Sequence, residues 1–311
     1  MTNDDAGGKG GTQSTPPPLP RQALDRRRHA VRDDLAALSL RDRVTAPRYA
    51  PGIVRQIIRP SVPLRREPSN KLGFETEALY GELARVYDEA EGWAWVQLER
   101  DRYVGYLPSV ALTGEIVPTT HRVKALGTFI YPAPDIKTPP LLHVPLNAEL
   151  CVAEWDERFC RLERGGYVIT RHLTERDRFE RDFVDVAERL IGSPYLWGGR
   201  TRIGIDCSGL VQVSLEASGV AAPRDTDMQA AELGTAIPVP DDLEGLKRGD
   251  LVFWPGHVGI MSDGIMLVHA NAHHMAVAVE TLPEAADRIA KQSAPISTIR
   301  RISAAPVERD A

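Results

Sequence analysis

Three residues of this 311-residue chain have the types and the order that covalent acyl-transfer chemistry needs. Cys207 lies in residues 204–210 (GIDCSGL), His257 follows fifty residues later in residues 256–260 (GHVGI), and His269 comes twelve residues after that. A thiol nucleophile, an imidazole base and a third group that orients the imidazole are sufficient for this chemistry. None of the three is beside another in the sequence, so the fold must bring them together.

The nucleophile is predicted at the first turn of a helix that begins at residues 206–208 and ends at Gly219. The partial positive charge at a helix start favours the Cys207 thiolate over the thiol. Asp206 is either the cap of this helix or a contact to the substrate, and both interpretations stay open. The main-chain N–H of Cys207, together with the Tyr195 hydroxyl, is the expected pair of donors to an oxyanion.

The two histidines fall on two predicted strands, residues 257–261 and 265–269. A three-residue loop over residues 262–264, with glycine last in the left-handed conformation, is a favoured hairpin turn. That loop pairs residues whose numbers sum to 526, so His257 and His269 are expected directly opposite each other on one face. A two-residue loop would send them to opposite faces.

This arrangement predicts a division of roles. We expect His257 to take the Cys207 proton and later to protonate the leaving amine, while His269 fixes the tautomer of His257. Zinc is the rival use of the same three residues, because one Cys and two His can ligate the ion with an open fourth position. The chain has no Cys-x-x-Cys or His-Glu-x-x-His pattern, so we expect no metal and no other cofactor. A chelator that removed activity would favour zinc.

The N-terminal half of the chain has two kinds of segment. Residues 1–48 are predicted to hold a Gly-, Ser- and Pro-rich disordered tail and then a helix over residues 21–40. Residues 49–115 contain short β-type runs separated by turns, as in a small barrel, and residues 118–175 read as a weaker second copy.

After Thr174 the apolar residues change to helical spacing, with Thr174 as the predicted cap of a helix that ends near Gly192. Strands are predicted at residues 250–254, 257–261, 265–269 and 276–280. Helices followed by an antiparallel sheet indicate an α+β domain over residues 176–305. The expected fold is therefore multidomain, with two small all-β barrels before an α+β catalytic domain.

Composition narrows the function classes. The chain is 42% apolar and 26% charged, and a net charge of −5 gives no basic surface for nucleic acid. No stretch is long enough to span a bilayer and the first residues lack an apolar signal region, so we expect a cytoplasmic location and no membrane partner. Three cysteines fit a reducing compartment, with Cys151 and Cys160 as inert core thiols; in an exported protein those two could pair. Nothing in the sequence specifies the oligomeric state.

Five motifs along the C-terminal half resemble, in order, the NlpC family of papain-like cysteine peptidases. They are residues 194–199 (PYLWGG), 206–211 (DCSGLV), 223–229 (PRDTDMQ), 249–254 (GDLVFW) and 256–260 (GHVGI). The resemblance implies hydrolysis of bacterial cell-wall peptides beside the γ-linked D-glutamate. It implies the same roles for Cys207, His257 and His269 as nucleophile, base and orienting residue.

The N-terminal half resembles bacterial SH3-like domains through residues 92–98 (GWAWVQL) and 103–109 (YVGYLPS). Two such domains before an NlpC domain resemble the γ-D-glutamyl-L-diamino acid endopeptidases of dipeptidyl-peptidase VI type. Those enzymes cleave the bond from γ-D-glutamate to diaminopimelate or lysine in murein peptides with a free N-terminal L-alanine. The implied partner is therefore a murein peptide, and the implied role is recycling of cell-wall peptides.

In that group the first SH3-like domain supplies an acid and a tyrosine to the substrate amine. Glu75 and Tyr103 match these positions best, with Tyr106 as the alternative tyrosine; otherwise Glu75 is a surface acid and Tyr103 packs the barrel. The other substrate-contacting positions implied by the resemblance are Tyr195, Trp197, Asp206, Ser208 and Thr226. Two other functions stay open, namely an exported endopeptidase that binds intact peptidoglycan and an acyltransferase with the same triad.

Overall fold

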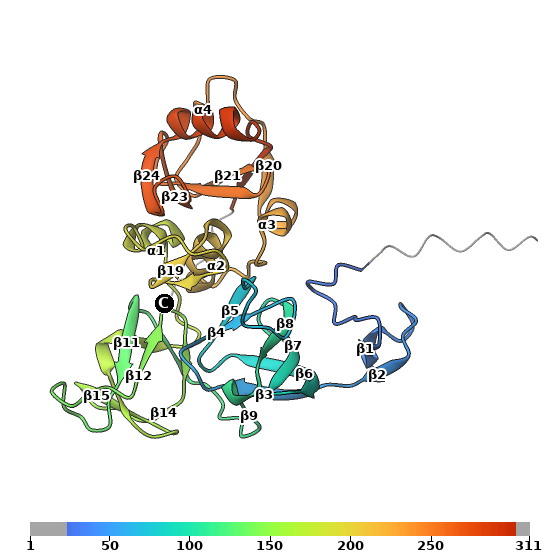
Figure 1. Ribbon diagram of the computed structural model, residues 1–311. Coiled ribbons are helices and arrows are strands. Elements are labelled where there is room, and N and C mark those ends of the chain that lie inside the picture. Colours follow the sequence, from blue (N-terminus) through green and yellow to red (C-terminus); the bar gives the residue numbers. More distant parts are fainter. Residues whose placement is uncertain (1–23, 303–311) are drawn as a thin grey trace, which may run out of the picture.

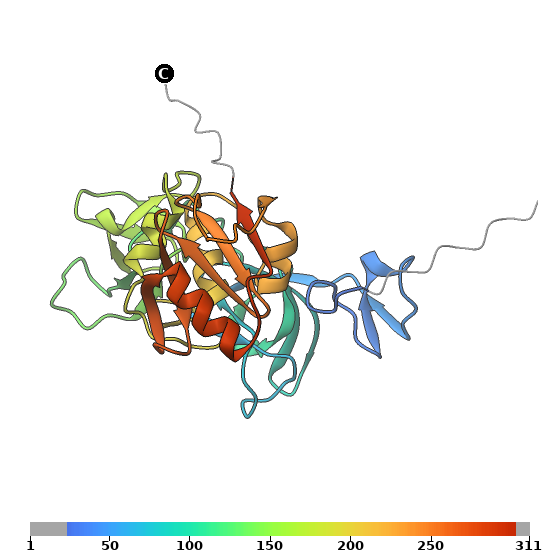
Figure 2. The same cartoon turned by 90° about the horizontal axis from the view of Figure 1, so that it is seen from above.

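The computed structural model describes residues 24–302, which form three units in chain order after a short N-terminal segment (Figure 1). In the C-terminal unit, helices α1 and α2 face the two β units, and helix α4 lies beyond the sheet (Figures 1 and 2). The disordered tail predicted within residues 1–20 lies outside the described residues. Among residues 24–302 we find no helix with the length and apolar character needed to cross a membrane.

The segment before the first β unit is not the helix predicted for residues 21–40. From Leu35 onward it holds two short parallel strands and a 3-10 turn, namely β1 (Leu35–Ala37), η1 (Leu38–Leu40) and β2 (Arg48–Ala50). Leu35 and Leu40 share a buried cluster with Tyr87 and Trp95 of the first β unit. Strand pairing and this docking override the local helical composition, which is a weak preference by itself.

The first β unit is a small barrel around one apolar core that includes Ile57, Leu64 and Leu107. A five-stranded antiparallel sheet has the order β8-β7-β6-β3-β9, and the hairpin of β4 and β5 joins it through a bridge from Arg65 to Tyr106. The elements are β3 (Ile53–Ile57), β4 (Ser61–Leu64), β5 (Thr76–Leu79), β6 (Leu83–Ala90), β7 (Trp93–Leu98), β8 (Val104–Pro108), η2 (Ser109–Ala111) and β9 (Leu112–Thr113).

The second β unit repeats the element order and the pairings of the first. Strand β10 lies between β13 and β17 as β3 lies between β6 and β9, and β14-β15-β16 repeats the meander β6-β7-β8. It has a separate core, in which Cys160 is buried, while Cys151 is half-buried at its edge. The elements are β10 (His121–Val123), β11 (Gly127–Ile130), β12 (Leu142–Pro145), β13 (Glu149–Leu150), β14 (Val152–Glu154), β15 (Phe159–Leu162), β16 (Tyr167–Ile169), η3 (Thr170–His172) and β17 (Leu173–Glu175).

The C-terminal unit is a six-stranded antiparallel sheet with helices on both faces. The strand order is β20-β25-β21-β22-β23-β24, and the four strands predicted from residue 250 onward form within one or two residues of their expected bounds. The strands are β18 (Arg200–Thr201), β19 (Gly204–Ile205), β20 (Thr235–Ile237), β21 (Asp250–Trp254), β22 (His257–Met261), β23 (Met266–Asn271), β24 (Ala276–Thr281) and β25 (Thr298–Arg301). The short strands β18 and β19 pair separately.

Two layers of helix pack on this sheet. The helices are α1 (Phe183–Arg189), α2 (Cys207–Ala217), α3 (Thr226–Glu232) and α4 (Leu282–Gln292). Helices α1 and α2 share the larger core with the sheet, while α4 covers the opposite face through Leu282 and Ala285. The predicted cap of α1 was wrong, because Asp182 accepts from the Val184 N–H at 2.8 Å while Thr174 lies in β17.

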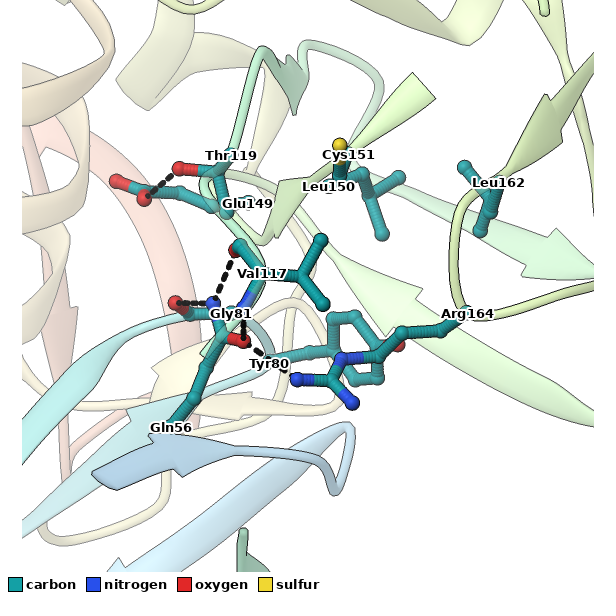
Figure 3. A pocket seen from close by; sticks show the side chains of 10 residues that line it. All are labelled: Gln56, Tyr80, Gly81, Val117, Thr119, Glu149, Leu150, Cys151, Leu162 and Arg164. Atoms are coloured by element: carbon teal, nitrogen blue, oxygen red, sulfur yellow. Dashed lines mark hydrogen bonds between the residues drawn. The ribbon is translucent and has the colours of Figure 1, made fainter. Parts of the chain in front are cut away.

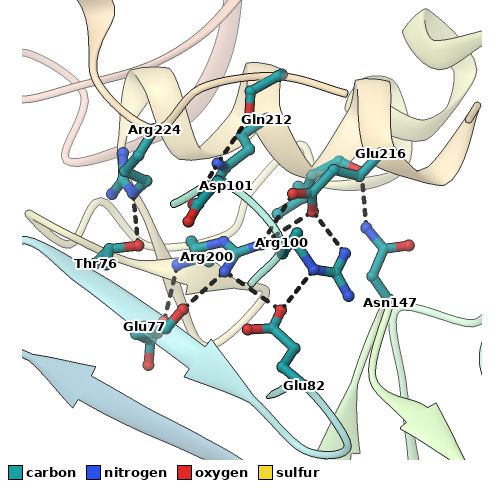
Figure 4. A network of polar contacts seen from close by, with 12 residues as sticks. Thr76, Glu77, Glu82, Arg100, Asp101, Asn147, Arg200, Gln212, Glu216 and Arg224 are labelled. Carbon is teal, nitrogen blue, oxygen red and sulfur yellow. Dashed lines mark hydrogen bonds and ion pairs between the residues drawn. The ribbon is translucent and has the colours of Figure 1, made fainter. Parts of the chain in front are cut away.

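A buried ionic network joins the three units (Figure 4). Arg200 of the C-terminal unit donates to the Glu77 carbonyl at 2.8 Å and pairs with Glu216 of α2 at 2.9 Å. Arg100 of the first unit binds Glu82 at 2.9 Å and Glu149 of the second unit at 3.3 Å. Because Glu216 lies in the helix that begins at Cys207, these contacts fix the two β units relative to Cys207.

Candidate active site

Helix α2 begins with the candidate nucleophile. Asp206 caps the helix, since its Oδ1 accepts from the Gly209 N–H at 2.7 Å, and Cys207 is the first helical residue, as predicted. The helix start favours the thiolate, but burial, with the Asp206 carboxylate acting in the same direction, raises the pKa of the Cys207 thiol to about 11. Burial outweighs the helix dipole here, so the thiol needs a base to remove its proton.

The hairpin that carries the histidines has a different register from the predicted one. Ile260 pairs with Val268 and Met261 with Leu267, so paired residue numbers sum to 528 rather than 526. Asp263 explains the longer turn, because its Oδ1 accepts from the N–H groups of both Ile265 and Met266, each at 2.7 Å. A shift of two keeps side chains on the same face, so the histidines become diagonal neighbours instead of direct partners.

The two imidazoles are in direct contact. His257 Nε2 lies 2.8 Å from His269 Nδ1, and His269 Nε2 lies 2.7 Å from Glu280 Oε1. Arg288 donates to both oxygens of Glu280. Although burial alone would raise the pKa of Glu280, hydrogen bonds from Arg288 and His269 lower it to about 2.

This chain of contacts sets the tautomers. An ionised Glu280 only accepts, so His269 Nε2 donates to it and His269 Nδ1 accepts from His257 Nε2. The remaining nitrogen of His257, Nδ1, then carries the lone pair. The main-chain amide of Val258, the next residue after His257, interacts with the Cys207 thiol, so the start of strand β22 lies beside the start of helix α2.

Both histidines are neutral at pH 7. Burial, together with the neighbouring His269 and Arg288, lowers the pKa of His257 to about 3. Burial also lowers the pKa of His269, to about 4, against the opposing effect of Glu280. The resting site is therefore a thiol and a neutral imidazole, which suits general-base activation at the moment of attack.

Tyr195 lies close enough to the start of α2 to be influenced by its charges. Burial raises the pKa of the Tyr195 hydroxyl to about 12, and the negative charge of Asp206 acts in the same direction. Its hydroxyl therefore stays protonated at neutral pH. The oxyanion role predicted for Tyr195 remains a prediction.

The first barrel reaches the site through Tyr103. The Tyr103 hydroxyl donates to Asp225 Oδ2 at 3.0 Å, and the next residue, Thr226, has its Oγ1 4.0 Å from the Cys207 sulfur. Glu75 is close enough for its charge to raise the pKa of Tyr103, although its own carboxylate pairs with Arg66 at 2.9 Å. Tyr103, Thr226 and Glu75 thus gather at one end of the site.

Asp206 and Ser208 are held by a buried arginine. Arg224 donates to Ser208 Oγ and to Asp206 Oδ2, both at 2.7 Å, and to Thr76 Oγ1 at 3.0 Å. Of the two interpretations of Asp206, the structure shows the helix cap. A substrate contact for Asp206 or Ser208 remains a prediction.

Trp197 lies on a loop that docks on the first barrel. Its side chain is 62% exposed, so it does not pack the core. The following residue, Gly198, has a φ of +79°, and a Cβ there would lie 2.6 Å from the Phe74 carbonyl oxygen. Only glycine allows this approach, which brings the backbone beside Trp197 against Phe74 of the barrel.

Sequence reasoning missed four residues of the site, namely Arg224, Asp225, Glu280 and Arg288. Asp225 lies inside the motif of residues 223–229, but no role was inferred for it. A signal for Glu280 was present, because strand β24 pairs Ala278 with His269 and puts Glu280 on the same face, two residues further along.

The same residues bear on metal binding. Within residues 24–302, three potential ligand atoms of His269, His274 and Glu280 lie within 4.8 Å of one another. Cys207 and His257, which the zinc alternative requires, are not members of this group. The Arg288 guanidinium on both Glu280 oxygens opposes a cation there, so the donor set does not fit a metal well.

A small cavity of about 10 Å³, partly open to solvent, lies between the two β units (Figure 3). Its lining includes Tyr80 and Gln56 of the first unit and Cys151 and Arg164 of the second. None of its lining residues comes from the C-terminal unit, so the cavity is separate from the Cys207 site.

Comparisons with known proteins agree with this geometry. Residues 64–112 match the bacterial dipeptidyl-peptidase Sh3 domain, and residues 192–290 match the NlpC/P60 family. The chain is 28% identical over 246 residues to dipeptidyl-peptidase 6 of Lysinibacillus sphaericus. The matched region covers 71% of this chain and 89% of that protein. It is also 24% identical over 233 residues to a γ-D-glutamyl-L-lysine dipeptidyl-peptidase of Bacillus cereus, and the matched region covers 67% of this chain and 65% of that protein.

One solved structure shares the overall fold. An NlpC/P60 family protein from Bacillus cereus superposes with a TM-score of 0.66 over 80% of this chain and 99% of that one. Its sequence identity to this chain is 19%, so the likeness is one of fold.

Proposed function

This chain is a peptidase of the NlpC/P60 family that carries a bacterial dipeptidyl-peptidase SH3 domain, and we propose a specific substrate for it. The substrate is a murein peptide with a free N-terminal L-alanine. The enzyme hydrolyses the bond between γ-D-glutamate and the following diamino acid, either diaminopimelate or lysine. The names of the two relatives, dipeptidyl-peptidase 6 and γ-D-glutamyl-L-lysine dipeptidyl-peptidase, support this reaction class.

One observation carries the proposal. The Tyr103 hydroxyl of the barrel bonds to Asp225 of the catalytic unit, and Thr226 next to it is 4.0 Å from the nucleophilic sulfur. An ammonium group needs a carboxylate and a hydroxyl oxygen, and both are present at this end of the site. The contact of the barrel's Tyr103 with Asp225, one residue from Thr226, puts this carboxylate a short distance from Cys207, which suits release of a dipeptide.

The proposed reaction uses His257 as base and then as acid. His257 Nδ1 takes the thiol proton as the Cys207 sulfur bonds to the γ-carbonyl carbon of D-glutamate. The tetrahedral intermediate collapses, the amine of the diamino acid leaves, and it receives the proton from the imidazolium. Water, deprotonated by the same imidazole, then splits the thioester and releases L-Ala-γ-D-Glu and the free thiol.

Selectivity for a free amine tests the substrate assignment. We expect L-Ala-γ-D-Glu-diaminopimelate to be cleaved at least about 100-fold more efficiently than its N-acetylated form, because acetylation removes the charge that Asp225 would bind. Mass spectrometry of the products from both peptides measures this ratio. Equal cleavage of both would refute the substrate assignment, and transfer to an added amine would indicate an acyltransferase.

The charge of Glu280 should matter for turnover. We expect Glu280→Gln to lower kcat by about 10- to 100-fold at unchanged KM, because the amide keeps the hydrogen bond but no longer stabilises the imidazolium pair. Steady-state kinetics of Glu280→Gln and of Glu284→Gln, an exposed acid on α4, make the comparison. An equal effect of both substitutions would remove Glu280 from the proposed mechanism.

We also infer that residues 118–175 are a second SH3-like copy, because they repeat the strand order and pairings of the first β unit. Recycling of murein peptides in the cytoplasm is a further proposal. Cell fractionation followed by immunodetection tests it, and recovery with the cell wall would favour an exported endopeptidase.

A further inference from the structure

The N-terminal segment crosses from the first barrel to the catalytic unit at the end of the site where Tyr103 lies. Its backbone is held on the barrel, because the Val104 N–H donates to the Arg27 carbonyl and Gln97 Nε2 donates to the Arg28 carbonyl, both at 2.7 Å. The Arg28 side chain pairs with Glu232 at the end of α3. The segment is therefore a fixed part of the site wall.

Arg27 directs its guanidinium at the start of α3. It donates to Asp225 Oδ2 at 2.9 Å and to the two oxygens of Asp227 at 2.9 and 2.7 Å. Asp25, on the same segment, supports the guanidinium from behind at 2.7 Å. The Arg27 side chain is 35% exposed and the Asp225 side chain 22%, so the pair lies at the rim of the site and a solute can reach it.

Arg27 and Tyr103 share one oxygen. Asp225 Oδ2 accepts from both of them, so both of its lone pairs are in use, and the guanidinium offsets the carboxylate charge. Glu75, the other acid at this end, pairs with Arg66. Arg66 is 73% exposed, however, so that pair is screened by water and is easily opened.

We propose that Arg27 is a specificity-determining residue that occupies the ammonium subsite and competes with the N-terminal amine of the substrate for Asp225. This inference rests on the proposed function. A peptide with a free amine must displace the guanidinium before its own ammonium binds, whereas an N-blocked peptide gains nothing from the displacement. Arg27 thus weakens binding of the peptide with a free amine and has no such effect on an N-blocked peptide. It therefore reduces the factor by which the enzyme prefers the free-amine peptide.

The test compares Arg27→Gln with Arg26→Gln in the full-length protein. Arg26 is the neighbouring arginine and pairs only with Asp33 in the described structure, which makes it a matched control. For L-Ala-γ-D-Glu-diaminopimelate we expect Arg27→Gln to lower KM by about 3- to 10-fold at unchanged kcat. The reason is that the substrate amine no longer has to break the partly exposed ion pair between Arg27 and Asp225. We expect no change in KM for Arg26→Gln, and no gain for Arg27→Gln on the N-acetylated peptide.

The outcomes separate the two proposals. If wild type prefers the free amine but Arg27→Gln behaves like Arg26→Gln, or raises KM, the role of Arg27 is refuted and the substrate assignment stands. If wild type cleaves both peptides equally, the substrate assignment fails and the role of Arg27 fails with it. Thermal melting of both variants identifies loss of folding as a separate cause of any KM change.

Discussion

Replacing Cys207 by alanine should reduce peptide turnover by about 10⁴-fold or more. In the proposed mechanism the reaction depends on a covalent bond from this sulfur, and the other two cysteines of the chain, Cys151 and Cys160, lie in the second β unit. His257 remains in the variant, but without the sulfur it can activate only water. Product formation followed by mass spectrometry over a hundredfold range of enzyme concentration measures the loss.

The matched control is Cys160→Ala. Cys160 is fully buried in the core of the second β unit, and burial raises the pKa of its thiol as it does for Cys207. We expect this variant to lose some stability and to keep its turnover. Activity of Cys207→Ala within tenfold of wild type, at an unchanged melting temperature, would disprove the covalent mechanism.

Replacing Arg200 by methionine should cost about 3–5 kcal/mol of stability, because removing one partner leaves buried acids without their counter-charge. Arg200 is 1% exposed and pairs with Glu216 at 2.9 Å and Glu82 at 3.5 Å, and its main-chain N–H binds the Glu77 carboxylate at 2.8 Å. Thermal and urea unfolding of the two proteins measure the difference.

The pH dependence of this variant has a definite sign. Burial already raises the pKa of Glu82, with Arg100 and Arg200 opposing the rise, so loss of Arg200 raises it further. A carboxyl whose pKa is higher in the folded than in the unfolded state favours folding at low pH, and this contribution is lost as pH rises through the folded-state pKa. The Arg200→Met deficit should therefore be smaller at pH 5 than at pH 8.

Arg248→Met is the control for this experiment. Arg248 also binds three acids, Asp182, Asp185 and Glu188, but its side chain is 35% exposed. Exposed pairs contribute about 0–1 kcal/mol. A similar deficit in both variants would show that burial of the Arg200 network is not what stabilises the junction.

The sequence predicted which residues form the site better than it predicted the protonation state of the Cys207 thiol. The types and spacing of His257 and His269 were sufficient to predict that the two imidazoles meet, while the attack of Cys207 with their help stays a prediction. The resting thiol was not predictable, because a helix start favours the thiolate whereas the opposing burial arises only in the folded protein. Glu280 was missed because its contact with His269 depends on which strands pair, and Arg288 was missed because it reaches this group only through Glu280.

The errors in the fold have local causes. Residues 21–40 have helical composition, but Leu35 and Leu40 dock on the first barrel in a strand and turn instead. Thr174 was predicted as a helix cap because the apolar spacing changes there, whereas β17 continues through it and Asp182 caps the helix. In both cases a tertiary contact decides between local structures of similar propensity.

The longer turn of the histidine hairpin has an evolutionary consequence. Since side chains alternate between faces, lengthening or shortening the loop between Met261 and Leu267 by two residues leaves both imidazoles on the same side of the sheet. A slip of strand β23 by one residue against β22 would instead turn His269 away from His257 and disconnect Glu280 from the base. Functional descendants can therefore vary the length of this loop only where the pairing of Met261 with Leu267 is kept.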